Sequence, residues 1–197
     1  MGSRAAPGRL VRNQLLLDLG RTDVQDFVIG TLDRLLGTYD ISYFKWDMNR
    51  PPAERGAPRA GRVDLDAEHV AGYLRVLDHL RSAHPDVTVE GCAGGGGRIE
   101  HATIARTDVV WPSDNTAPLD RLRIQHGSLR AHAPHVMSSW VTDAPGVFDP
   151  RPRSLAFRFV NAMLRSPGHR RRPARLDAGA ADRGRRVDRP VQGGAGT

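Results

Sequence analysis

The sequence predicts an α/β fold with parallel strands, and two observations support this prediction. Short apolar and β-branched segments alternate with segments whose apolar residues recur at helical spacing. This alternation is typical of parallel strands joined by right-handed helical crossovers. Unusual polar residues also follow several different strands rather than one or two. We therefore favour a (β/α)8 barrel, whose strand ends share one face, over an open doubly wound sheet.

The strands and helices can be placed in order. We predict strands at residues 15–17, 41–46, 86–90, 109–111 and 136–141. A first helix starts at Thr22 and Asp23 and ends at Gly37. A second covers residues 66–83, with Val70, Leu74, Leu77 and Leu80 on one face, and Pro85 stops it. Two more helices follow, one after Ser113–Asp114 and one at 154–164. A full barrel needs eight strands and about 250 residues, so five or six strands predict a partial barrel.

The composition limits the class of protein to which this chain can belong. A hydrophobic content of 39% with 26% charged residues is that of a soluble globular protein. The single cysteine, Cys92, excludes an internal disulfide. We expect no membrane span, and the N-terminus lacks the apolar core of a secretory signal, so the expected location is the cytoplasm.

The net positive charge is concentrated in the last 33 residues. Of the net charge of +7, residues 165–197 carry +6, from nine arginines and three aspartates. We therefore divide the chain into an N-terminal stub (1–11), a patterned domain (12–164) and a basic tail (165–197). The tail is either a disordered segment that touches nucleic acid non-specifically or the product of a frame change in a GC-rich gene. No specific nucleic-acid partner is expected.

Two candidate carboxylates follow predicted strands. Residues 43–50 read Tyr-Phe-Lys-Trp-Asp-Met-Asn-Arg and present Lys45, Asp47 and Asn49 at a strand end, where ligand sites gather. A second segment, 111–116, reads Trp-Pro-Ser-Asp-Asn-Thr and presents Asp114. A solvated turn also explains the first segment, and a helix N-cap explains Asp114 equally well.

A glycine run, 94–97, follows a third predicted strand. It lacks the Lys-Ser/Thr ending of a P-loop and the spacing of a dinucleotide fingerprint, which excludes nucleotide binding. We interpret it as a segment without side chains, whose backbone a ligand can approach closely, although a flexible loop is the alternative. Cys92 has no evident His/Asp relay and is expected to line a pocket. The histidines show no metal-binding spacing, so no metal site is expected.

Four segments, at residues 12–19, 43–50, 90–98 and 111–116, together resemble the α-galactosidases of glycoside hydrolase family 36. The resemblance implies a retaining enzyme on a (β/α)8 barrel, flanked by an N-terminal β-sandwich and a small C-terminal β-domain. It places Asp47 at the nucleophile and Asp114 at the acid/base. The further positions that it assigns to sugar binding or the pocket wall are Arg12, Lys45, Asn49, Cys92, Gly94 and Trp111.

The residue types suit that chemistry. A retaining glycosidase needs one ionised and one protonated carboxyl group. Lys45 would keep Asp47 ionised, and a dry setting by Trp111 would keep Asp114 protonated. The resemblance implies small α-galactoside oligosaccharides such as melibiose or raffinose as substrates, possible homo-oligomers of the full-length enzymes, and no cofactor.

Departures from the family leave a second function open. The β-sandwich, the first barrel strands and an upstream acidic sugar-binding motif have no counterpart in residues 1–11. The alternatives are an inactive remnant with at most weak carbohydrate binding, or a related specificity such as α-N-acetylgalactosamine.

Overall fold

Three parallel strands form the sheet in the part of the chain that the structure describes. The computed structural model describes residues 14–49, 64–146 and 149–164. The strands β1 (Tyr43–Asp47), β2 (Thr88–Cys92) and β3 (Val109–Val110) lie in the order β1-β2-β3. Asp47 pairs with Cys92, and Gly91 pairs with Val110, so the carboxyl ends of the strands meet at one edge. The α/β class with parallel strands is confirmed.

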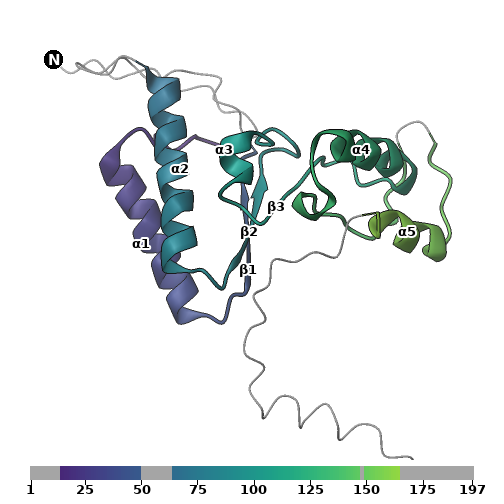
Figure 1. The fold of residues 1–197 in the computed structure, drawn as a ribbon, viewed down its shortest axis with the longest axis horizontal. Helices are drawn as coiled ribbons and strands as arrows, with labels where there is room; N and C mark the ends of the chain where they lie inside the picture. Colours follow the sequence, from purple (N-terminus) through teal and green to yellow (C-terminus); the bar gives the residue numbers. More distant parts are fainter. Residues whose placement is uncertain (1–13, 50–63, 147–148, 165–197) are drawn as a thin grey trace, which may run out of the picture.

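Helices connect the strands. The sheet is covered by α1 (Thr22–Thr38) and α2 (Leu65–Ala83), which lie side by side in Figure 1. A short α3 (His101–Ile104) leads to β3, and α4 (Pro118–Ala131), the 3-10 turn η1 (Pro134–Val136) and α5 (Leu155–Ala162) follow it. The four predicted helices are confirmed, and α3 escaped prediction because four residues show no periodicity.

Local capping explains where two of the helices begin. Asp64 precedes α2 and accepts hydrogen bonds from the backbone N–H groups of Asp66 and Ala67. Ser154 precedes α5 and accepts one from Phe157. These bonds satisfy N–H groups that have no partner inside a helix, typically contributing about 1 kcal/mol each.

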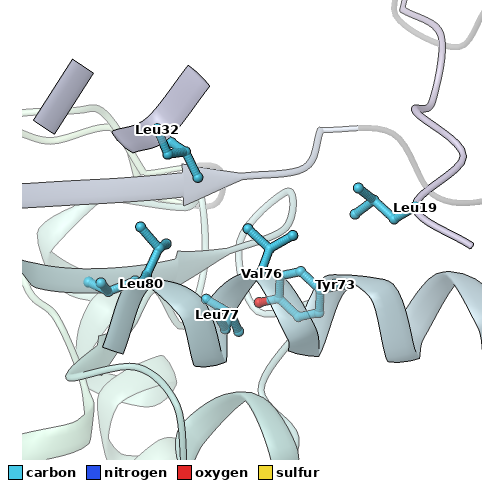
Figure 2. Packing of buried hydrophobic residues seen from close by; sticks show 7 residues of the cluster. Leu19, Leu32, Tyr73, Val76, Leu77 and Leu80 are labelled. Atoms are coloured by element: carbon cyan, nitrogen blue, oxygen red, sulfur yellow. The ribbon is translucent and has the colours of Figure 1, made fainter. Parts of the chain in front are cut away.

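The hydrophobic core lies between α1, α2 and the first two strands. Figure 2 shows Leu32 of α1 and residues of α2 around the strands, with Leu19 from the segment before α1. Val70, predicted on the buried face of α2, is 51% exposed, because the buried face turns through Tyr73, Val76 and Leu77 instead. The cluster of buried core residues consists of Leu19, Leu32, Tyr73, Val76, Leu77, Leu80 and Val89.

A smaller polar core joins α4 to α5. Gln125 of α4 is fully buried, donates to Asn161 of α5 at 2.6 Å and accepts from Ser139 at 3.0 Å. Asn161 donates in turn to the carbonyl of Pro118. Because each amide has a partner, this interior is polar without a large desolvation cost.

Two predicted strands were wrong. Residues 15–18 have irregular backbone, with Leu15 73% and Leu17 54% exposed. Residues 138–141 are also irregular, and Pro134 starts a 3-10 turn where the strand was expected. Only an isolated parallel bridge from Met137 to Val110 remains of it. An apolar run needs a partner backbone to become a strand, and among the described residues these segments lack a continuous one.

Several predictions lie outside the described residues, namely the stub at 1–11, Arg12 and the tail at 165–197. No helix among the described ranges is long and apolar enough to cross a membrane.

Candidate active site

The candidate site lies at the carboxyl edge of the sheet, where the segments after β1, β2 and β3 meet. Asp47 is the last residue of β1 and lies opposite Cys92, the last residue of β2. Asp114 follows four residues after the end of β3. The edge of a parallel sheet therefore brings together residues that are remote in sequence, as the sequence predicts.

Asp47 is the better defined of the two carboxylates. One oxygen accepts from the N–H of Gly94 at 3.3 Å and the other from Asn49 Nδ2 at 2.9 Å. Partial burial raises the pKa of Asp47, but hydrogen bonds from Cys92, Gly94 and Asn49, with the charge of Lys45, outweigh it and leave the pKa below its usual value. Asp47 is therefore ionised at neutral pH.

Cys92 supports Asp47 rather than acting as a nucleophile. The thiol is 1% exposed, and burial, followed by its contact with the Asp47 carboxylate, raises the pKa of Cys92 to about 11. The thiol therefore keeps its proton at neutral pH and can donate it to Asp47. Its predicted place in the wall of a pocket stays a prediction.

The glycine loop connects the two carboxylate segments. Gly94 and Gly95 have φ angles of +53° and +88°, which favour glycine. A Cβ on Gly95 would lie 2.9 Å from the backbone nitrogen of Asp114. The loop thus binds Asp47 through Gly94 and packs against the backbone of Asp114 through Gly95. Close approach of a ligand to this loop stays a prediction.

Asp114 is not the N-cap of the helix that follows. The cap of α4 is Ala117, and Pro118 is the first helical residue. Ser113 accepts from the N–H of Asn115 at 3.1 Å, so the turn is held by other side chains. Asp114 instead accepts from Trp111 Nε1 at 3.0 Å. Its side chain is exposed, so the described residues do not surround it with the dry setting that the sequence predicts.

Lys45 lies between a buried carboxylate and two indole rings. Its Nζ is 3.3 Å from Glu90 Oε1 and 4.6 Å from the ring centroids of both Trp111 and Trp140. The two rings stack with centroids 4.4 Å apart. Glu90 is 1% exposed and also accepts from Tyr43 and Ser138. This arrangement fixes the ammonium group by charge and by cation–π attraction.

Three residues of this site escaped prediction: Glu90, Arg121 and Trp140. Arg121 is 2% exposed, donates to the carbonyls of Ser113 and Ser138, and lies over the Trp111 ring at 4.7 Å. Glu90 stands in a predicted strand, where a charge among apolar residues signals a buried partner. Trp140 lies near the end of the strand predicted at 136–141, and a position at a strand end was the signal that could have identified it as a site residue.

A pocket of about 310 Å³ opens beside Asp47, between α1, β1 and the segment before α1. Its wall is apolar, with Leu19, Leu32 and Phe44, and Asp47 and Asn49 supply polar groups. Trp46 packs edge-on against Tyr73 with centroids 5.3 Å apart, so its ring belongs to the core. Among the described residues, no group with metal-ligand geometry includes Asp47 or Asp114.

These features define a parallel α/β chain with two carboxylates at the carboxyl edge of its sheet. The chain belongs to the melibiase family, whose model matches residues 3–183. Alpha-galactosidase 2 of Hypocrea jecorina is 40% identical over 158 residues, and alpha-galactosidase AgaA of Geobacillus stearothermophilus is 35% identical over 161. Both alignments cover 80% of this chain and 20% and 22% of those proteins. The chain thus spans about one-fifth of the length of these relatives.

Solved structures agree with the family and confirm the resemblance to glycoside hydrolase family 36. The crystal structure of AgaA superposes with a TM-score of 0.72 at 34% identity, covering 80% of this chain and 22% of that chain. A variant of AgaA in complex with raffinose gives a TM-score of 0.74 at 35% identity, with the same coverage. Another variant was solved in complex with stachyose.

Proposed function

We propose that this chain carries the nucleophile and the acid/base of a retaining α-galactosidase, which removes terminal α-linked D-galactose from small oligosaccharides. The observation that carries the proposal is the glycine loop, because Gly94 binds Asp47 and Gly95 packs against Asp114. The loop thereby ties the two carboxylate segments to one edge of the sheet. A retaining glycosidase needs such a pair about 5 to 5.5 Å apart across the bond that it breaks.

In the proposed mechanism Asp47 attacks the anomeric carbon. Its depressed pKa keeps it ionised, as a nucleophile requires. Asp114 donates its proton to the leaving oxygen, and the galactosyl group becomes covalently attached to Asp47. Asp114 then removes a proton from water, which attacks the anomeric carbon and frees Asp47. Two inversions retain the α configuration.

Lys45 and the stacked indoles are proposed as the wall that holds the sugar. Trp140 is 50% exposed, so its ring offers apolar surface to a sugar face. Lys45 is positioned by Glu90 and supplies hydrogen-bond donors to hydroxyl groups. Raffinose and stachyose, found bound to variants of the relative from Geobacillus stearothermophilus, are the kind of substrate that we propose.

The decisive experiment separates the roles of the two carboxylates. We would measure nitrophenol release from an aryl α-D-galactoside by the 197-residue chain and by its variants Asp47→Gly and Asp114→Gly. Each protein is assayed both without and with azide. Without azide we expect at least a roughly thousandfold loss in either variant, in line with loss of a group acting as a covalent nucleophile or proton donor. With azide, Asp47→Gly should form the β-galactosyl azide by direct attack, whereas Asp114→Gly should form the α-azide from the covalent intermediate.

Asp143→Gly is the matched control. Asp143 is an exposed aspartate whose ion pair with Arg158 of α5 is long, at 4.0 Å. This variant should turn over like the unmodified chain. The alternative function, an inactive remnant with weak carbohydrate binding, is favoured by the one-fifth coverage of the relatives. Binding of 1-deoxygalactonojirimycin by a folded chain without any turnover would support that alternative and contradict catalysis by this chain alone.

A further inference from the structure

A cluster of one aspartate and two histidines lies at the end of the molecule opposite the candidate active site. Asp33 belongs to α1 and His79 to α2, and His84 is the C-cap residue directly after α2. Because Tyr43 and Thr88 begin the strands shortly after these helices end, the cluster lies near the amino ends of the strands. Asp47 and Cys92 lie at their carboxyl ends. The proposed catalysis therefore does not use this cluster.

Both histidine side chains contact the same carboxylate oxygen of Asp33. Asp33 Oδ1 lies 2.8 Å from His79 Nε2 and 2.7 Å from His84 Nε2. The backbone of His84 is not helical, with φ −129° and ψ 59°. The two rings are 6.3 Å apart between centroids and are inclined by 68°. The rings therefore approach one carboxylate oxygen from two directions.

The atoms are arranged as ligands of one ion. The two imidazole nitrogens and the carboxylate oxygen all lie within 4.8 Å of one another. The side chains are 41%, 30% and 19% exposed for Asp33, His79 and His84, so an ion can reach them and can retain water ligands. Hydrogen bonds from His79 and then His84 hold the pKa of Asp33 below its usual value, so the carboxylate is ionised at neutral pH.

We infer that Asp33, His79 and His84 form a structural binding site for a divalent transition-metal ion such as Zn²⁺, which links α1 to α2. Two imidazoles and a carboxylate are a donor set that Zn²⁺ takes, with bonds of about 2.0 to 2.2 Å and water in the remaining position. Around such an ion the ligand atoms lie about 3.3 Å apart, so the two separations between Asp33 Oδ1 and the imidazole nitrogens must open by about 0.5 Å. Partly exposed side chains can make that adjustment by small rotations.

Chemistry decides against a hard cation. Ca²⁺ and Mg²⁺ prefer six or more oxygen ligands, and this site offers one carboxylate with two nitrogens. Zn²⁺ takes the place of the proton on each Nε2 that contacts Asp33, so protons compete with the metal for this site. An ion that binds only the folded chain also stabilises it.

The test measures Zn²⁺ binding to the metal-free, untagged 197-residue chain by competition with a chromophoric chelator. We expect one site of micromolar or tighter affinity, at least tenfold weaker in Asp33→Ala, His79→Ala and His84→Ala. His126→Ala is the matched control, since His126 is an exposed histidine on α4, and its affinity should be unchanged. Equal affinity in all four variants, or no binding below about 100 μM, would overturn the inference.

A second measurement needs no variant and covers the case in which one fails to fold. Zn²⁺ should protect His79 and His84 of the unmodified chain from diethylpyrocarbonate, as read by peptide mass, while His126 and His132 remain reactive. Zn²⁺ should also raise the melting temperature, whereas Mg²⁺ at the same concentration should not. Equal modification of all four histidines in the presence of Zn²⁺ would contradict the site, independently of any glycosidase activity.

Discussion

At the scale of single residues, the ionisation of Asp47 depends on the thiol beside it. Burial raises the pKa of the Asp47 carboxyl, and the hydrogen bond from Cys92 is the largest of the effects that lower it. Cys92→Ala removes that donor and should raise the pKa of Asp47, whereas Cys92→Ser retains a donor and should leave it lower. Titration of the Asp47 carboxyl by carbon NMR in the folded variants measures both values.

The sign of the effect follows from linkage. A carboxyl group whose pKa is depressed by folding stabilises the folded state above its unfolded pKa, and that stabilisation is lost as the pH falls through the folded pKa. In Cys92→Ala the stabilisation should therefore be smaller, and its loss should be complete at a higher pH, than in Cys92→Ser. If both variants titrate at the same pH, the thiol does not control Asp47, and the N–H of Gly94 and Asn49 carry the effect.

How much of the site could be predicted also depends on single residues. Lys45, Asp47 and Cys92 were placed at one edge correctly, because a charge after an apolar run marks a strand end. Glu90 and Trp140 were missed as partners of Lys45, since their contact joins residues up to 95 positions apart and leaves no local pattern. Sequence spacing alone could not distinguish an N-cap at Asp114 from a carboxylate that accepts a hydrogen bond from Trp111.

At the scale of elements, one glycine lets the segment before α1 pack against α2. A Cβ on Gly72 would lie 1.8 Å from the carbonyl oxygen of Leu19, the same oxygen that accepts from Gln25 at 2.7 Å. Gly72→Ala should therefore destabilise the chain by about 3 kcal/mol or more, through overpacking. Gly30 of α1 is exposed with nothing within 4 Å of its Cβ position, so Gly30→Ala should stabilise by about 0.5 to 1 kcal/mol.

Urea unfolding followed by circular dichroism compares the two variants, with stability extrapolated linearly to water. Both place alanine in a helix, so helix propensity changes alike and the difference reports the contact with Leu19. Equal stabilisation in the two variants would mean that the segment at Leu19 does not pack on α2 as described.

The elements also show why the helices were predicted better than the strands. Helical periodicity is local, and α1 and α2 carry it over 17 and 19 residues. A strand is completed by another strand, and residues 15–17 and 136–141 have apolar sequences without a continuous partner among the described residues. The count of strands was therefore the weakest part of the prediction, and the barrel stays a prediction.

At the scale of the whole molecule, apolar surface remains uncovered. The outward face of α5 exposes Phe159 by 50% and Val160 by 64%, and Leu155 and Met163 beside them are more than half exposed. The chain matches only about one-fifth of the length of its curated relatives. A contiguous exposed apolar patch of this kind binds hydrophobic dyes and promotes association.

The isolated chain should therefore bind an anilinonaphthalene dye below its unfolding temperature. The double variant Phe159→Lys/Val160→Lys should reduce the dye fluorescence by about half or more while keeping the helical circular dichroism, because both side chains are at least half exposed. Arg130→Lys, on the exposed surface of α4, keeps the charge and should change neither signal. If the double variant binds as much dye as the unmodified chain, the dye reports loose packing of the core instead, as in a molten globule, and a non-cooperative thermal transition should accompany it.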